Sequence, residues 1–122
     1  MQPSRRGPGA PVTVRRAHPP RGENWEHGRV DLATFQACMV ETYGERDRAR
    51  GTAATVAWLA EELGELARAV RKGTRDEQRH ELGDVLAWLA SLAAQLDLSL
   101  ADAAQRYAHG CPRCRARPCA CP

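Results

Sequence analysis

The sequence EELGELARAV, residues 61–70, carries three carboxylates beside an apolar stripe. The sequence ELGDVLAWLA, residues 81–90, repeats this combination with Glu81 and Asp84. Around both segments the apolar residues step by three and four, which is the spacing of an amphipathic helix. The two apolar seams are Val56, Leu59, Leu63, Leu66 and Val70, and Leu82, Val85, Leu89, Leu92 and Leu96. We therefore predict two helices that pack antiparallel across a short turn at Gly73.

Turn and capping signals set the bounds of four predicted helices. They span about 31–43, 52–72 (with Thr55 as the alternative start), 75–96 and 100–109. Asp31 is the predicted N-cap of the first helix, and Ser99 is that of the fourth, with Asp102 at the third helical position as in a capping box. The charged segment 43–51, which follows the first helix, is predicted to be a loop.

The sequence favours one all-α domain, a small antiparallel four-helix bundle, flanked by two end segments that differ from it in composition. The chain has 122 residues, of which 43% are hydrophobic and only 5% aromatic, and this favours helices over a β-sandwich. We expect a disordered Arg-, Pro- and Gly-rich extension over residues 1–30, the helical domain over 31–109, and a Cys-rich tail over 110–122. Positive charge is concentrated in the two ends and the helical part is acidic, so a nucleic-acid partner is disfavoured.

The location and the assembly follow from the same features. No apolar run reaches the length of a membrane span, and the N-terminus lacks the apolar core of a secretory signal. We expect a cytoplasmic protein without a membrane partner, in which the five cysteines are free thiols or metal ligands rather than disulfides. Because a domain of this size buries a limited share of its surface, we also expect a second copy to complete the core, and the family resemblance described below extends this expectation to a homodimer or homotetramer.

Four carboxylates take mirrored positions about the predicted turn. Glu65 and Glu81 each lie eight residues from Gly73, and Glu62 and Asp84 each lie eleven residues from it. Antiparallel packing would set these side chains on two facing rungs, where like charges repel one another. A divalent cation would relieve the repulsion. Oxygen ligands select Mg²⁺ or Mn²⁺, and Mg²⁺ commonly also takes phosphate oxygens, so we expect a polyphosphate substrate.

Three other interpretations of the acidic residues are less favoured by the sequence. A single EExxE segment is common on a solvated helix face, and only the mirrored ExxD segment favours a metal site. A di-iron bundle is disfavoured because no histidine stands three residues after Glu62, Glu65 or Glu81, and His80 is expected to face elsewhere. The phosphate-binding pattern G-x-x-x-x-G-K-[ST] is absent from the sequence.

The pattern EExxE at 61–65 followed by ExxD at 81–84 resembles the signature of the MazG-like all-α nucleoside triphosphate pyrophosphohydrolases, over about residues 31–109. The resemblance implies a helical bundle that assembles as dimers or tetramers. It also implies Mg²⁺-dependent cleavage of a (deoxy)nucleoside triphosphate to the monophosphate and pyrophosphate, as housecleaning of the nucleotide pool. The implied metal ligands are Glu62, Glu65, Glu81 and Asp84. Glu61 or Glu62 is the candidate catalytic base.

Substrate contacts are less well marked. Many relatives continue the last helix with a Lys and an Asn that contact phosphate, and this sequence has QRYAHGCPRC at 105–114 instead. The candidate contacts are therefore Arg46, Arg48, Arg50, Arg106, Trp58 and Trp88. The two tryptophans would either stack on a base or pack in the core, and a buried indole N–H would still need a partner.

The tail holds four cysteines, spaced C-x2-C-x4-C-x-C. They are Cys111, Cys114, Cys119 and Cys121. Four thiols within eleven residues suit a structural tetrahedral Zn²⁺, and His109 is a candidate substitute ligand. The alternative is a frayed, redox-sensitive tail. A second functional hypothesis follows, in which the chain is a catalytically inactive, zinc-stapled interaction or regulatory module. Cys38 is expected to be a small core residue.

Overall fold

Four α-helices and one short 3₁₀ helix make up the described part of the chain, which contains no strand. The computed structural model describes residues 30–122, so nearly all of the predicted N-terminal extension lies outside the described residues. The elements are α1 Leu32–Arg50, α2 Thr52–Lys72, α3 Arg75–Gln95, α4 Leu100–Ala104 and the 3₁₀ helix η2 Gln105–Tyr107. The predicted all-α fold is confirmed.

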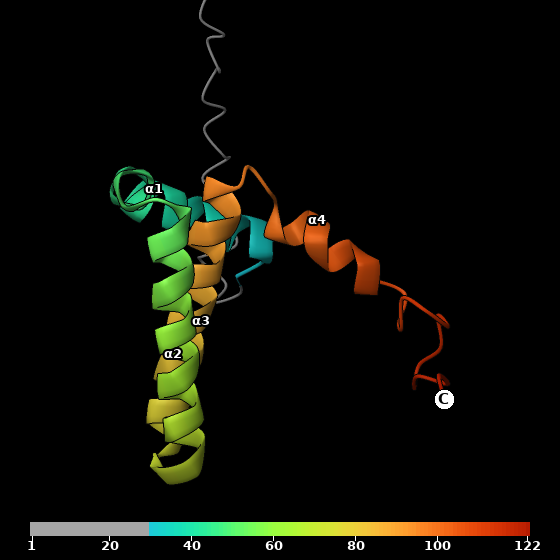
Figure 1. Cartoon of the computed structure of the whole chain (residues 1–122). Helices are drawn as coiled ribbons and strands as arrows, with labels where there is room; N and C mark the ends of the chain where they lie inside the picture. The colour runs from blue at the N-terminus through green and yellow to red at the C-terminus, as the bar shows by residue number, and fades with distance from the viewer. Residues whose placement is uncertain (1–29) are drawn as a thin grey trace, which may run out of the picture.

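The helices α2 and α3 form a long antiparallel hairpin (Figure 1). The hairpin turns at Gly73, where an added Cβ would lie 2.8 Å from the carbonyl oxygen of Ala69. Thr74 then begins α3 with a capping box. Its hydroxyl accepts from the Glu77 N–H at 3.2 Å, and the Glu77 carboxylate accepts from the Thr74 N–H at 2.6 Å. The capping signal TRDE at 74–77 is legible in the sequence, but the prediction of this helix start rested on the Gly73–Thr74 break alone.

The helix α1 lies across the end of the hairpin at which α2 begins and α3 ends (Figure 1). The prediction of a loop over 43–51 is wrong, because α1 continues through Arg50. Its last turns are held in place by packing: Gly44 and Asp47 are buried, and Asp47 binds Arg50 at 2.7 Å. The charged residues Glu45, Arg46 and Arg48 of the same segment are exposed. The helix ends at Gly51, whose φ of 86° is a conformation that favours glycine.

A side chain of α1 also holds the connection between α3 and α4. The Gln36 amide donates to the Leu98 carbonyl at 2.7 Å and accepts from the Leu100 N–H at 2.8 Å. Ser99 caps α4 as predicted, accepting from the Asp102 N–H at 3.1 Å. The predicted helix over 100–109 is too long. Its α-helical part ends at Ala104, and a 3₁₀ turn continues only to Tyr107.

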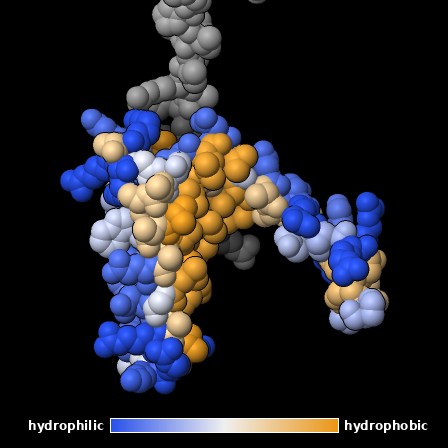
Figure 2. Space-filling view, in the orientation of Figure 1, coloured by the Kyte–Doolittle hydropathy of each residue, from blue (hydrophilic) through white to orange (hydrophobic). Residues whose placement is uncertain are grey.

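Much of the apolar surface of the hairpin is exposed in the single chain. The buried apolar side chains of the described part are only Ala69, Ala90 and Ala93. The predicted seams do not pack wholly inside the hairpin. Along each helix, seam residues spaced seven apart leave between 38% and 64% of their surface exposed. These residues are Val56, Leu63 and Val70 on α2, and Leu82, Leu89 and the C-cap Leu96 along α3. Figure 2 shows a continuous apolar band along the hairpin.

No single helix within residues 30–122 is both long and apolar enough to cross a membrane. The pair formed by α3 and the run 100–107 meets the length and composition criteria only when taken together, across a bend of 108°.

Candidate functional site

Three carboxylates from the two hairpin helices meet at one place. Glu62 comes from α2, and Glu81 and Asp84 come from α3. Each offers an oxygen that lies within 4.8 Å of the oxygens of the other two, and all three residues are half-buried. The i, i+3 spacing of Glu81 and Asp84 puts both on the face of α3 that meets α2. The antiparallel hairpin then brings Glu62 to the same height.

Burial and neighbouring negative charge act together on the Glu62 carboxyl. Desolvation raises the pKa of its carboxyl above the ordinary value, and the neighbouring charge of Asp84 raises it further. Glu81 and the adjacent Glu61 add smaller repulsive effects. The Trp88 indole N–H, a hydrogen-bond donor to this carboxylate, opposes the shift. Three carboxylates this close together also concentrate negative charge at one place, as a site for a cation does.

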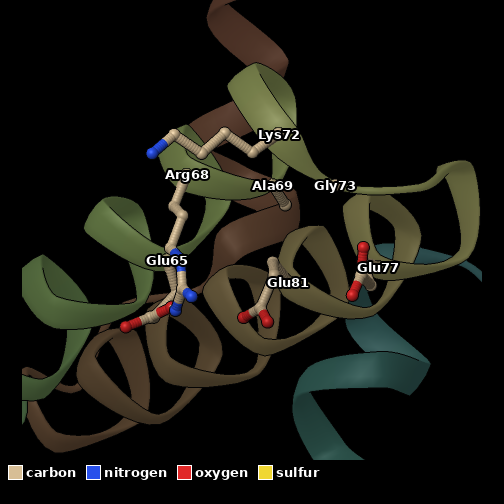
Figure 3. Close-up of a pocket in the computed structure, with 7 residues that line it drawn as sticks. All are labelled: Glu65, Arg68, Ala69, Lys72, Gly73, Glu77 and Glu81. Carbon is tan, nitrogen blue, oxygen red and sulfur yellow. The ribbon is translucent and has the colours of Figure 1, made fainter.

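Glu65 stands apart from this cluster. Its side chain is about half exposed and lies 3.7 Å from the Arg68 guanidinium. It lines a neighbouring open hollow together with Glu81, as Figure 3 shows. The remaining lining residues are Arg68, Ala69, Lys72, Gly73 and Glu77. Glu81 therefore belongs to both the three-carboxylate cluster and the hollow, and it joins them into one surface.

Two cations beside the carboxylates were not identified as site residues from the sequence. Arg68 and Lys72 line the hollow from the last turns of α2. The signal was available in their spacing from Glu65, at three and seven residues, which keeps all three on one side of the helix. His80 was predicted to face elsewhere, and this is wrong. Its Nε2 lies 3.3 Å from Asp84 Oδ2, because an i, i+4 pair shares a helix face.

An aromatic stack borders the cluster on the side away from the Gly73 turn. The rings of Trp58 and Trp88 are parallel within 10°, with centroids 5.8 Å apart. Trp58 keeps 45% of its surface exposed, whereas Trp88 is half-buried. The Arg50 guanidinium lies 4.7 Å from the centre of a Trp88 ring and also binds Asp47. Each tryptophan lies fifteen residues from Gly73, and the antiparallel hairpin brings the two rings into contact at that equal distance from the turn.

The other predicted substrate contacts are spread over the surface. Arg46 and Arg48 are exposed on the last turns of α1. Arg106 lies over the Tyr107 ring at 5.4 Å, on the arm that points away from the hairpin (Figure 1). Glu61 is exposed beside Glu62 and does not belong to the three-carboxylate cluster. Of the six predicted substrate contacts, Arg50, Trp58 and Trp88 form one connected group next to the carboxylates.

Comparison with known proteins identifies the family of this chain. A family model described as the MazG nucleotide pyrophosphohydrolase domain matches residues 50–113, more than half of the chain. This chain belongs to the MazG family. The matched region of the MazG domain contains α2, α3, α4, all the clustered carboxylates and the first cysteine of the tail.

One relative among the curated proteins is similar to part of this chain. It is the uncharacterized protein YpjD of Bacillus subtilis (strain 168), 46% identical over 66 residues. The match covers 46% of this chain and 60% of the length of YpjD. The name of YpjD assigns no activity.

The thiols of the tail form a second group. Cys111, Cys114, Cys119 and Cys121 each offer a sulfur within 4.8 Å of the others, and His109 is not part of the group. Cys38 lies separately on α1, half-buried rather than buried.

Proposed function

We propose that this MazG domain hydrolyses a (deoxy)nucleoside triphosphate to the monophosphate and pyrophosphate at the cluster formed by Glu62, Glu81 and Asp84. The observation that carries the proposal is the convergence of three carboxylate oxygens within 4.8 Å of one another, from two helices of a MazG-family chain. Glu65 lies next to this group and is the fourth proposed acid of the site.

The residues present fit a hard divalent cation. The cluster consists of carboxylates, and oxygen ligands suit Mg²⁺ or Mn²⁺. The proposed ligands are Glu62, Glu81 and Asp84, and Glu65 is the remaining candidate ligand. When bound, the cation would offset phosphate charge and lower the pKa of the attacking water.

The surroundings of the cluster suggest how a nucleotide would lie. On the side toward the Gly73 turn, Arg68 and Lys72 supply positive charge for the pyrophosphate leaving group. On the opposite side, the exposed Trp58 offers a ring on which a base would stack. Trp88 then acts as a positioning residue, because its N–H donates to Glu62 while its ring packs on Trp58. The reacting phosphates would therefore lie next to the three carboxylates, between Trp58 and the two cations.

Glu62 is the stronger of the two candidate bases. In the absence of a cation its carboxyl has a raised pKa, caused by burial and by the neighbouring carboxylates, so negative charge is concentrated around it. It also lies inside the cluster, where the water would be held, whereas Glu61 is exposed outside it. The Glu62 oxygen that is not bound to the cation would take the proton from the attacking water.

A second copy of the chain is the proposed cover of the apolar band. With 100° of rotation per residue, Val56, Leu63 and Val70 project to one side of the hairpin, and Trp58 and Glu65 project to the other. The band is long and apolar, and the hairpin buries only small side chains against its own neighbours. Self-association would remove this surface from water and leave the carboxylate side free.

Pyrophosphate release tests the proposal. The native protein would be incubated with a panel of canonical and modified (deoxy)nucleoside triphosphates, with Mg²⁺, with Mn²⁺ or with chelator. We expect metal-dependent release that is lost in Asp84→Asn and kept in Asp76→Asn. Asp76 is the matched control because it lies on the same helix, 91% exposed, and binds only Arg79 among the described contacts. Absence of release from every nucleotide by the folded native protein would refute the enzyme hypothesis.

A further inference from the structure

The tail contains a second group of metal-ligating side chains that pyrophosphate hydrolysis does not use. The Sγ atoms of Cys111 and Cys121 lie 3.7 Å apart, and those of Cys114 and Cys119 lie 3.8 Å apart. All four sulfurs lie within 4.8 Å of one another. Figure 1 shows this segment at the far end of the arm formed by α4 and η2. The group is therefore separate from the carboxylates.

The sulfur separations fit one tetrahedral ion. Four thiolates bound to Zn²⁺ at about 2.3 Å lie about 3.8 Å from one another. Both paired separations in the tail match this edge length. A disulfide, by contrast, requires about 2.05 Å between its sulfurs, and all four cysteines are free thiols.

The backbone of the tail holds the first two cysteines in a closed turn. The Arg115 N–H donates to the Cys111 carbonyl at 2.7 Å, and the Cys111 N–H donates to the Ala116 carbonyl at 3.3 Å. The turn needs two residues with positive φ, 108° at Gly110 and 59° at Arg115. A Cβ at Gly110 would also lie 2.8 Å from Arg117 Cγ. The turn thus presents Cys111 and Cys114 on one side of a compact loop.

Backbone N–H groups point at two of the sulfurs. The Ala120 N–H donates to Cys114 Sγ, and the Cys121 N–H donates to Cys119 Sγ, both at 3.4 Å. Such donors offset negative charge on sulfur and orient the ligands, as outer-shell contacts do at metal sites. Four thiolates around one Zn²⁺ leave two negative charges in excess, and Arg113, Arg115 and Arg117 lie between the ligands in sequence.

The tail has no apolar core to hold this arrangement. Every residue from 110 to 122 is half-buried or exposed. Arg117 donates to the Ala108 carbonyl, which attaches the tail to the end of η2 but does not close its second half. In segments this small, a structural metal commonly supplies the missing stability.

We propose that Cys111, Cys114, Cys119 and Cys121 bind one structural Zn²⁺ in a closed four-thiolate site. Each thiol gives up its proton on binding, and no electron transfer is involved. The site leaves no open position for water, so it acts as a staple of the tail and not as a second catalytic centre. It needs no contribution from His109.

Metal content of the full chain tests the site. The protein, reduced and loaded with Zn²⁺, would be freed of excess metal and its zinc counted against protein. We expect one zinc per chain in the native protein, in Cys38→Ser and in Asp84→Asn, and none in the double variant Cys114→Ser with Cys119→Ser. Substitution with Co²⁺ should give a thiolate-to-cobalt absorption band with the same dependence. Helical circular dichroism would establish that each variant is folded.

Three results would overturn the proposal. The first is a zinc-free native chain whose four tail thiols all react with a thiol reagent. The second is a native chain whose mass stays four units below that of the fully reduced chain even in the presence of a reductant, which would show two disulfides. The third is zinc that persists in the double cysteine variant. Because zinc content is measured without a nucleotide, these results are independent of pyrophosphate release.

Discussion

The carboxylate cluster of the hairpin and the thiol cluster of the tail are alike in scale and opposite in construction. Each brings its ligating atoms within 4.8 Å of one another. Glu62 and Asp84 are 22 residues apart and meet only because α2 and α3 pack together. The thiols span eleven residues and meet because of local turns. Tertiary packing therefore builds the first site, and the local backbone builds the second.

The chemistry of the ligands differs in the same way. Oxygen ligands on rigid helices suit a hard cation that shares its coordination with phosphate. Four sulfurs suit a softer ion whose coordination is complete. A perturbation of the hairpin should consequently affect nucleotide chemistry and spare zinc, and a perturbation of the tail should do the reverse.

The largest expected effect is the loss of activity when a carboxylate of the cluster is removed. Glu62→Gln should lower pyrophosphate release by on the order of 10²–10³-fold, because it removes charge that is preorganised at the reacting phosphate. Glu65→Gln should cost at least tenfold less, since Glu65 is half exposed and lies beside Arg68. Steady-state rates of both variants with Mg²⁺ would measure the difference. Equal losses would place Glu65 inside the metal site.

The second effect concerns the apolar band. Leu63→Asp should weaken self-association at least tenfold, which corresponds to about 1.4 kcal/mol or more, because it puts a charge into the proposed contact. Sedimentation equilibrium would measure this. Ala57→Asp is the matched control on α2, since Ala57 is exposed on the side away from α3. Equal effects of both variants, or a monomeric native protein, would contradict the proposed self-association.

The third prediction concerns the capping box that begins α3, the helix that carries Glu81 and Asp84. Thr74→Ala should lower the free energy of unfolding by about 1 kcal/mol, because the Glu77 N–H loses its acceptor. Urea unfolding followed by circular dichroism would measure it. Thr52→Ala, at the exposed first position of α2, should change stability less, because Gly51 is the N-cap of that helix. Zinc content should not change in either variant.

A smaller, pH-dependent effect comes from the same capping box. Hydrogen bonds from Thr74 lower the pKa of the Glu77 carboxyl below its ordinary value of 4.5. An acid with a depressed folded-state pKa stabilises the fold fully above its unfolded-state pKa and loses that contribution as pH falls through the folded-state pKa. Native protein should therefore exceed Glu77→Gln in melting temperature at neutral pH, and the gap should close at acidic pH. A gap that is constant with pH would contradict a role for the ionised carboxylate.

The smallest expected effect is on hydrolysis when the tail is disrupted. In the variant that combines Cys114→Ser with Cys119→Ser, the pyrophosphate-release rate should stay near the native value, because the tail lies away from the hairpin. Assays with Mg²⁺ at equal protein concentration would establish this. A large loss would show that the two clusters are coupled, for example through the arrangement of two copies.

Some features could be predicted from the sequence because they depend on neighbouring residues. Asp31 and Ser99 were recognised as N-caps, and both accept the predicted backbone hydrogen bonds. The second helix was predicted within its observed bounds, from a clear start after Gly51 and a break at Gly73. The missed capping box at Thr74 was equally local, and its TxxE signal was legible.

Other features depended on partners distant in sequence. The charged segment 43–51 has the composition of a loop, yet it is helical because Asp47 is buried where α1 packs across the hairpin. Mirrored spacing predicted the heights of four carboxylates but not which oxygens converge. Glu65 points to the Arg68 side and Glu62 toward Asp84.

The sequence by itself determined the helical hairpin, its acidic residues and the grouping of the four thiols, since helical period, turn residues and short spacings act over a few positions. The tertiary structure decided that Glu62, Glu81 and Asp84 form one cluster, that His80 reaches Asp84, and that the Trp88 N–H serves Glu62. It also decided which half of each apolar seam remains uncovered. The physical reason is that rotation about a helix axis, which selects the side chains that meet, is fixed only by packing against another helix.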